Sequence, residues 1–312
     1  MSLNPKIAQF LEETRILPTL DRLSPQQARE MFDGFGQAAA KFVPEGVCIS
    51  DRTIPVAINY KLPLRIYTPE SQKKSLPILM FFHGGGWVLG ILESFDRLCS
   101  FLAKEAECLV ISVDYRRAPD FKFPTAAEDA YNATLWASQN GAELGSDPDR
   151  IAVAGDSAGG NLAAVVTLMA RDRKIPKLSH QLLIYPVMNY GFDTPSYRKF
   201  SDGYGLTREE MKWCWSHYLS HSEEGQNAYA SPLQAETLAN LPPARVLISE
   251  YDVLRSEADA YCDRLEADGV KVMRQFCPGL IHGFLGNPNL WEISEVVLRE
   301  IAVDLQKVLA EA

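Results

Sequence analysis

The residues with the clearest chemical potential are the pentapeptide Gly-Asp-Ser-Ala-Gly at 155–159. The apolar run 151–154 before it predicts a buried strand, and the apolar residues 161–171 after it predict a helix. A serine between two glycines at such a strand-to-helix turn is held above the sheet, because only glycine leaves room for so tight a turn. The helix N-terminus also places backbone N–H groups beside an oxyanion formed during attack. The pattern predicts that Ser157 is a nucleophile.

The candidate partners of this serine lie later in the chain. A serine hydroxyl is a weak nucleophile that needs a base, and the base needs an acid to orient it. Among the five histidines, only His282 lies in a loop directly after a late predicted strand. Asp252 ends the predicted strand 245–252, where functional groups of open α/β sheets collect. The order Ser157, Asp252, His282 predicts a nucleophile, an orienting acid and a general base. Structural or solvated roles are expected for His83, His180, His217, His221, Asp263, Glu266 and Asp268.

A second glycine-rich segment, His-Gly-Gly-Gly-Trp at 83–87, directly follows the unbroken apolar stretch 77–82. Three consecutive glycines cost conformational entropy, so they indicate a backbone that must approach another group closely. A phosphate-binding loop would need a different glycine spacing, which this segment lacks. The same composition is typical of loops that donate backbone N–H groups to an oxyanion. We therefore predict that this loop lies beside Ser157 and that His83 orients it.

Strands and helices alternate along most of the chain and must position these segments. Residues 1–45 are predicted to be helical, and a helix begins at Pro25 with Ser24 as its N-cap. Strands are predicted at 47–56, 58–67, 77–82, 109–113, 151–154, 181–185, 245–252 and 271–276. Helices are predicted at 94–106, 125–139, 161–171, 256–268 and 293–309. This alternation predicts a doubly wound α/β sheet within one domain spanning residues 1–312.

Residues 190–230 interrupt the alternation between two predicted strands. A helix predicted at 207–219 is rich in aromatic residues, which allows two interpretations: a lid over the active site, or a helix that merely packs on the sheet. In the first interpretation the helices of 1–45 complete the same cap. The aromatic candidates for substrate binding are Trp87, Trp213, Trp215 and Tyr218.

Composition narrows the class of protein. The chain has 312 residues, of which 46% are hydrophobic, so it can bury a sizeable core. Its net charge of −9 argues against nucleic acid or an anionic membrane surface as a partner. No secretory signal and no apolar run long enough for a membrane span is recognised. The six scattered cysteines predict free thiols of a reducing compartment and no metal site, so a cytoplasmic protein is expected.

Taken together, these segments resemble the hormone-sensitive-lipase-like branch of the α/β-hydrolases, which includes bacterial carboxylesterases. The matching segments lie in the family's order at 83–87, 114–119, 155–160, 251–255 and 282–284. The resemblance implies an α/β-hydrolase fold with a mostly parallel eight-stranded sheet, a helical cap from about 1–45 and about 190–230, and no cofactor. It also implies oxyanion donors at Gly85, Gly86 and Ala158, with Gly84 setting the loop. Two positions depart from the family pattern, which usually has Gly at Glu250 and Asp at Ser256. We expect Ser256 to cap the helix that follows.

The activity implied is hydrolysis of short-to-medium-chain acyl esters, of about four to eight carbons by resemblance to the family. A small-molecule ester is thus the expected partner, without stable membrane association. Two alternatives stay open: an amidase or deacetylase with the same triad, and a ligand-binding member without catalysis. The sequence leaves the oligomeric state open, with a homodimer among the alternatives.

Overall fold

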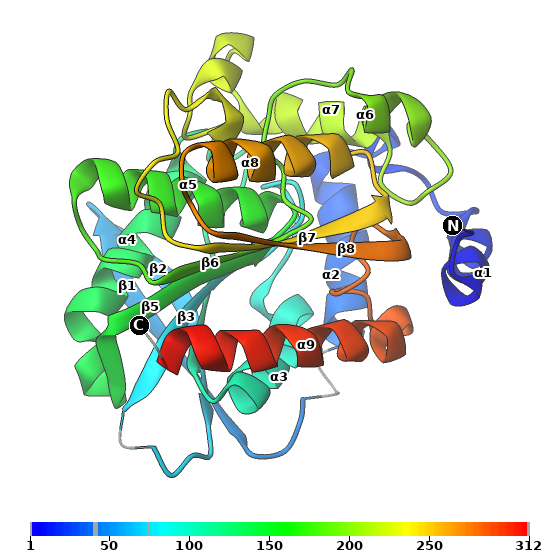
Figure 1. Cartoon of the computed structure of the whole chain (residues 1–312). Helices are drawn as coiled ribbons and strands as arrows, with labels where there is room; N and C mark the ends of the chain where they lie inside the picture. The colour runs from blue at the N-terminus through cyan, green and yellow to red at the C-terminus, as the bar shows by residue number, and fades with distance from the viewer. Residues whose placement is uncertain (1, 40–42, 74, 311–312) are drawn as a thin grey trace.

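A computed structural model of the chain describes residues 2–39, 43–73 and 75–310. Its centre is an eight-stranded sheet with the order β1-β2-β4-β3-β5-β6-β7-β8. β1 pairs with β2 and β2 with β4 in antiparallel fashion, whereas β3 to β8 pair in parallel. The predicted mostly parallel, eight-stranded sheet is therefore confirmed (Figure 1).

The strands agree with the predicted segments within a few residues, apart from two longer ones. They are β1 (Val47–Ala57), β2 (Tyr60–Pro69), β3 (Leu76–Phe82), β4 (Leu109–Val113), β5 (Ser146–Asp156), β6 (His180–Ile184), β7 (Ala244–Tyr251) and β8 (Val272–Ile281). β3, β4 and β6 are buried along their whole length, because helices cover both faces of the sheet there. β5 begins earlier than predicted, and β8 continues through Pro278 and Gly279 to Ile281. Proline is tolerated in β8 because β8 is an edge strand.

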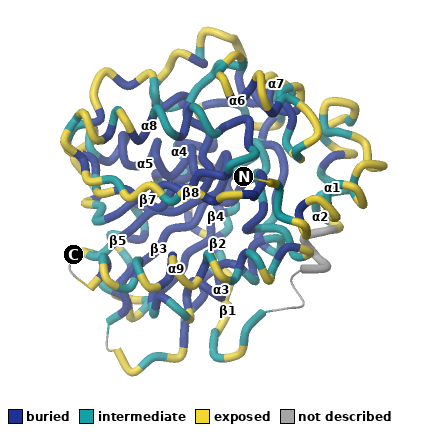
Figure 2. The backbone as a smooth tube through the Cα atoms, turned by 45° about the vertical axis from the view of Figure 1, so that its right-hand side comes forward, coloured by how far each residue is buried: buried dark blue, intermediate teal, exposed yellow. Residues whose placement is uncertain are grey.

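Five of the helices form a layer on each face of the sheet. The α-helices of the described residues are α1 (Pro5–Thr14), α2 (Pro25–Ala39), α3 (Asp96–Ala106), α4 (Thr125–Asn140), α5 (Ala158–Arg173), α6 (Pro195–Lys199), α7 (Arg208–Tyr218), α8 (Arg255–Ala267) and α9 (Trp291–Ala310). α3 and α9 cover one face, and α4, α5 and α8 cover the other (Figure 1). The central strands are mostly buried, whereas the edge strand β1 and the first half of β8 are partly exposed, as are the outer helices and loops (Figure 2).

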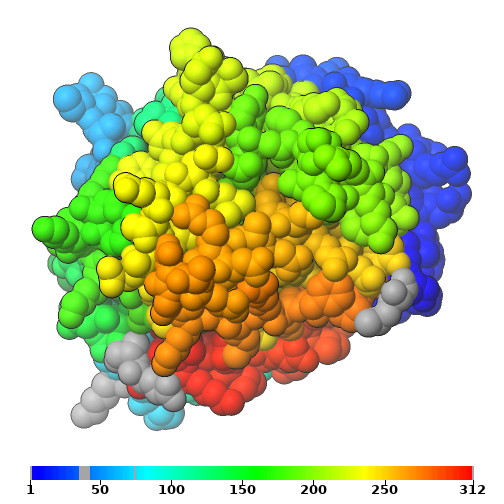
Figure 3. Space-filling view, turned by 45° about the horizontal axis from the view of Figure 1, so that its top comes forward, coloured from blue at the N-terminus to red at the C-terminus, as the bar shows by residue number. Residues whose placement is uncertain are grey.

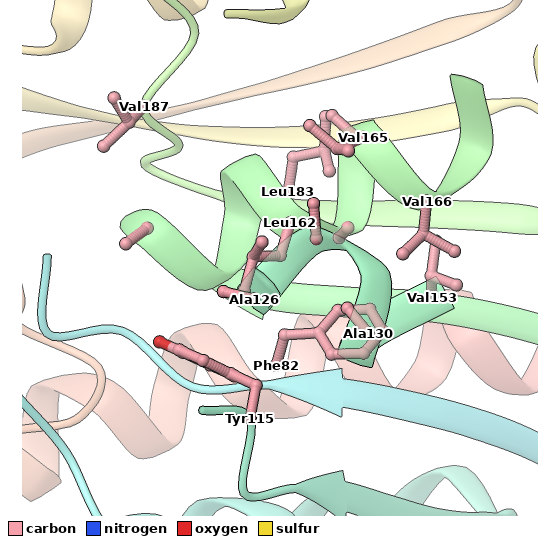
Figure 4. Packing of buried hydrophobic residues seen from close by; sticks show 14 of the residues in the cluster. Phe82, Tyr115, Ala126, Ala130, Val153, Leu162, Val165, Val166, Leu183 and Val187 are labelled. Carbon is pink, nitrogen blue, oxygen red and sulfur yellow. The ribbon is translucent and has the colours of Figure 1, made fainter. Parts of the chain in front are cut away.

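The core beneath the nucleophile is apolar and fully enclosed. Leu162 of α5, Phe82 of β3 and Ala126 of α4 belong to one cluster of buried side chains, seen at close range in Figure 4. Each of these side chains is at most 1% exposed. A close-packed interior of this kind gives the turn that carries Ser157 a rigid support.

Helices from two distant parts of the sequence lie together above the C-terminal ends of the strands. The N-terminal segment before α2 contacts α7, since Glu210 Oε1 accepts a hydrogen bond of 3.0 Å from the Leu20 N–H. The Trp213 indole N–H donates to the Leu23 carbonyl at 3.2 Å. Figure 3 shows the two segments side by side on this face, in blue and in green to yellow. Residues 40–42 of the predicted cap lie outside the described residues.

Candidate active site

Ser157 occupies a sharp turn between β5 and α5. Its backbone has φ 55° and ψ −119°, in the left-handed range that non-glycine residues rarely adopt. A β carbon on Gly155 would overlap the Gly159 carbonyl, and one on Gly159 would overlap the Phe82 carbonyl. The Ser157 N–H donates to the Ile184 carbonyl at 2.9 Å, which ties the turn to β6. The motif therefore has the predicted strand–turn–helix setting.

His282 lies beside this serine because of the register of the last two strands. Tyr251 of β7 pairs with Ile281 of β8, so the residues that follow them leave the sheet next to each other. His282 Nε2 lies 2.8 Å from Ser157 Oγ, and His282 Nδ1 lies 2.7 Å from Asp252 Oδ2. A carboxylate only accepts hydrogen bonds, so Nδ1 carries the proton and Nε2 is free to accept from the serine hydroxyl. The structure thus brings the three sequence-predicted side chains together.

The segment that carries Asp252 is held from two sides. Asp252 is 2% exposed, and its Oδ1 accepts from the Leu254 N–H at 2.9 Å. The Ser196 hydroxyl of α6 donates to the Val253 carbonyl at 2.5 Å. The expected capping role of Ser256 is wrong: α8 begins at Arg255, its N-cap is Leu254, and no side chain caps it. Ser256 is therefore the second residue of the helix, and its Oγ accepts from the Ser196 N–H at 3.1 Å.

The glycine loop after β3 lies directly against the nucleophile turn. Phe82 pairs with Gly155 across the sheet, and the Gly84 N–H donates to Asp156 Oδ1 at 2.7 Å. Gly85 and Gly86 have φ values of 113° and 61°, which glycine adopts without strain. In the part of the chain that the structure describes, neither the Gly85 nor the Gly86 N–H has a hydrogen-bond partner. Such unpaired donors are what an oxyanion requires.

Comparison with known proteins agrees with this geometry. A family model described as the alpha/beta hydrolase fold matches residues 79–286, which contain all three members of the triad. The chain belongs to the α/β-hydrolase family. An arylesterase from Saccharolobus solfataricus is 37% identical over 98% of this chain and 100% of its own length. An ethyl acetate hydrolase from Pseudomonas putida is 34% identical over 98% of this chain and 99% of its own.

Solved structures place the chain in the esterase branch of the α/β-hydrolase family. The crystal structure of a thermostable esterase from Pseudomonas putida has a TM-score of 0.94 at 39% identity, with 99% of this chain and 98% of that chain covered. The resemblance to hormone-sensitive-lipase-like esterases is therefore confirmed, as is the α/β-hydrolase fold.

The other histidines of this α/β-hydrolase do not contact the serine. His83 is fully buried between Tyr115 and Phe95, with Nδ1 2.8 Å from the Gly84 carbonyl. Burial lowers its pKa to about 3, so the ring is neutral at physiological pH. This position fits the predicted orienting role within the glycine loop. His180 starts β6, His217 lies against Trp213 in α7, and His221 precedes a short 3₁₀ helix.

Asp156 links the nucleophile turn to the glycine loop. Its side chain is 6% exposed, and burial raises the pKa of its carboxyl to about 6. The Gly84 N–H and the nearby His282 both act against this rise, because each favours the charged form. The sequence motif contains Asp156, but no local pattern predicts its contact with Gly84, which lies far away in the chain.

The proposed substrate-binding rings are found in two settings. Trp87 and Tyr218 stack with centroids 4.2 Å apart and planes 4° apart, and Trp215 lies 4.6 Å from Trp87. These three rings are fully buried, and none of their N–H or O–H groups has a hydrogen-bond partner among the described residues. Trp213 is half-buried and points its N–H to the N-terminal segment. The Sγ of Cys214 in α7 fills the space where Gly86 would carry a β carbon, so α7 packs on the glycine loop.

Two arginines without a predicted role bind the segment that directly follows the glycine loop. Arg29 of α2 donates from Nε to the Val88 carbonyl at 2.9 Å and from Nη2 to the Ala118 carbonyl at 2.7 Å. Arg117 donates to the Gly90 carbonyl at 2.6 Å. Arg117 belongs to the 114–119 segment of the resemblance, but nothing in the sequence near Arg29 signals this contact.

Within residues 2–39, 43–73 and 75–310, no group of three His, Cys, Asp or Glu side chains is placed to hold a metal ion. None of the helices in these ranges has both the length and the hydrophobicity to cross a bilayer.

Proposed function

We propose that the protein is a serine carboxylesterase that hydrolyses short-to-medium-chain acyl esters through an acyl-enzyme on Ser157. The observation that carries this proposal is the pair of hydrogen bonds linking Ser157, His282 and Asp252 at 2.8 and 2.7 Å. The esterases that cover nearly the whole chain at 34–39% identity support the same class of reaction.

The reaction follows from the hydrogen-bond geometry of this triad. His282 Nε2 takes the Ser157 proton as Oγ attacks the ester carbonyl, and Asp252 stabilises the imidazolium. The N–H groups of Gly85, Gly86 and Ala158 receive the tetrahedral oxyanion, while Gly84 sets the loop through its bond to Asp156. His282 then protonates the leaving alcohol, and water repeats the cycle on the acyl-enzyme.

Replacement of the nucleophile tests the proposal. Ser157→Ala should lose roughly 10⁴–10⁶-fold in kcat on nitrophenyl butyrate while its circular dichroism is unchanged. A fluorophosphonate should label wild type at Ser157, as mapped by peptide mass spectrometry. Labelling at another residue, or retained turnover in Ser157→Ala, would overturn the assignment.

Substrate length is proposed from the cap. Trp87, Trp213, Trp215 and Tyr218 would bound the acyl site with rigid rings, and the relative named an ethyl acetate hydrolase supports small acyl groups. Each methylene that fits should contribute about 0.8 kcal/mol, and each misfit beyond the aromatic wall should cost about 1–3 kcal/mol. A nitrophenyl ester series should thus show an optimum near four to eight carbons, and Trp215→Ala should shift it to longer chains. Faster cleavage of long-chain triglyceride emulsions would contradict the cap proposal, and anilides of the same acyl groups test the amidase alternative.

The setting of the enzyme is part of the proposal. The six cysteines are free thiols, which supports a reducing compartment such as the cytoplasm.

We also propose a homodimer through the edge strand β8, whose Met273 and Phe276 are 49% and 42% exposed. The contact between the N-terminal segment and α7 supports a single domain with a cap built from both.

A further inference from the structure

A second buried carboxyl group lies close to the acid of the proposed triad. Glu257 is in the first turn of α8, which begins just after the Asp252 loop, and it is 2% exposed. No step of the proposed hydrolysis uses this side chain. Acidic side chains are almost never fully buried without a partner, so its position requires a reason.

The contacts of Glu257 connect the acid to the nucleophile. Glu257 Oε1 accepts a hydrogen bond of 2.7 Å from the Met188 N–H, in the segment that follows β6. The preceding residue, Val187, donates its N–H to the Ser157 carbonyl at 3.2 Å. The Val187 carbonyl in turn accepts from the Asn161 side chain of α5 at 2.9 Å. Glu257 therefore bridges the segment of Asp252 and the segment that supports Ser157.

The surroundings of the Glu257 carboxyl favour its uncharged form. Burial raises its pKa well above the ordinary value and the nearby Asp252 adds to the rise, whereas the backbone N–H groups of Met188 and Asn189 lower it. The Tyr197 side chain of α6 also faces this carboxyl, and its hydroxyl has no hydrogen-bond partner among the described residues. Glu257 Oε2 is likewise buried without a partner in the described ranges. Burial of a carboxylate that is not fully hydrogen-bonded is costly, which favours the uncharged form of Glu257.

We propose that Glu257 is a positioning residue that holds the Asp252 segment in register with the Ser157 turn. This inference rests on the proposed triad. An uncharged bridge fixes the distance between acid and nucleophile without adding a second negative charge beside Asp252. Since a displacement of about 1 Å can cost 10²-fold in rate, the bridge should affect kcat more than KM.

Three substitutions of Glu257 distinguish the effect of its charge from the effect of its side-chain length. Glu257→Gln keeps the length and an acceptor oxygen without a titratable proton, so kcat should stay within about threefold of wild type, and the pH–rate profile should keep its shape. Glu257→Asp shortens the side chain by one methylene and should lose contact with the Met188 N–H. We expect kcat to fall at least about tenfold in Glu257→Asp and Glu257→Ala, with KM within about threefold. Asp259→Ala, on the same helix but half-buried, is the matched control and should leave kcat unchanged.

The measurements use nitrophenyl butyrate hydrolysis, with active sites counted by fluorophosphonate titration so that partial unfolding is not mistaken for a lower kcat. If Glu257→Ala does not fold, the comparison of Gln and Asp variants still decides the question. A tenfold loss of kcat in Glu257→Gln would overturn the uncharged bridge, and full kcat in Glu257→Asp would overturn the positioning role. Asp252→Ala is assayed in parallel: if it retains activity, the triad itself fails, independently of Glu257.

Discussion

Ser157 is held in a backbone conformation that its own β carbon disfavours. With φ 55° and ψ −119° it has the geometry of the first central residue of a type II′ turn, a position that glycine prefers. Strain of this kind costs of order 1–3 kcal/mol and persists where the surrounding structure enforces it. The turn is enforced here by the close contacts of Gly155 and Gly159 with neighbouring carbonyl groups.

The strain can be measured by comparing two inactive variants. Ser157→Gly and Ser157→Ala both lose the hydroxyl, but only alanine keeps the strained β carbon. After allowance for the greater freedom of glycine in the unfolded chain, Ser157→Gly should be the more stable by about 1 kcal/mol in urea unfolding. Equal stability of the two variants would mean that the turn is unstrained.

Asp156 makes stability depend on pH. Its pKa rises from 3.8 to about 6 on folding, so the folded protein binds this proton more tightly than the unfolded chain does. The resulting stabilisation is complete below about pH 4 and is lost as the pH rises through 6, a change of about 3 kcal/mol at 1.36 kcal/mol per pKa unit.

Asp156→Asn should remove this dependence while keeping an oxygen for the Gly84 N–H. Its free energy of unfolding should therefore rise relative to wild type between pH 4.5 and 7, then stay level. Asp147→Asn is a control of opposite sign, because the hydrogen bond from Arg150 lowers the pKa of Asp147. If the difference in the free energy of unfolding between Asp156→Asn and wild type does not change with pH, the raised pKa of Asp156 is contradicted.

At the scale of elements, α2 takes part in the site through Arg29. The two hydrogen bonds of its guanidinium fix the carbonyls of Val88 and Ala118 beside the glycine loop, and Arg29 Nη2 also pairs with Asp120 at 2.8 Å. A helix near the N-terminus is thereby coupled to the proposed oxyanion donors. Lysine cannot reproduce such a forked contact.

Removal of this contact should impair catalysis without unfolding the protein. Arg29→Ala and Arg29→Lys should each lower kcat about tenfold on nitrophenyl butyrate, since misplaced oxyanion donors weaken transition-state binding. Arg22→Ala, at an exposed arginine in the turn just before α2, should behave as wild type. Unchanged kcat in Arg29→Ala would show that α2 only covers the loop.

At the scale of the whole molecule, β8 forms one edge of the sheet, and the Asn4 N–H of the N-terminal segment donates to its Gly279 carbonyl at 3.0 Å. Exposed edge strands tend to pair with another copy, and two-fold symmetry would place one β8 against the other. The Phe276 ring, with the Arg255 guanidinium 4.8 Å from its centroid, lies on this strand. The exposed Met273 and Phe276 of this strand support the proposed dimer.

Light scattering should give a mass of twice 34.8 kDa for wild type. Phe276→Arg should yield a monomer, because it places a second cation beside Arg255 at the proposed interface. Ile58→Arg, at a 93% exposed position in the turn between β1 and β2, is the matched control and should remain dimeric. A monomeric wild type would exclude the proposed dimer.

The sequence by itself determined the local features of this protein. Ser157, the glycine loop and most strands and helices follow from apolar periodicity and turn chemistry within short windows, which tertiary contacts did not override. Asp252 and His282 could be selected because each follows a predicted strand of an α/β sheet, where functional groups gather. The aromatic residues of 190–230 could be recognised as an insertion, although their packing could not.

Only the tertiary structure decided which distant groups meet. Strand register puts His282 beside Asp252, and it extends β8 to Ile281 although the local pattern ended the strand earlier. The bonds from Gly84 to Asp156 and from Met188 to Glu257 join residues 72 and 69 positions apart. Such contacts depend on the order and stagger of strands across the whole sheet, and a local pattern carries no information about either.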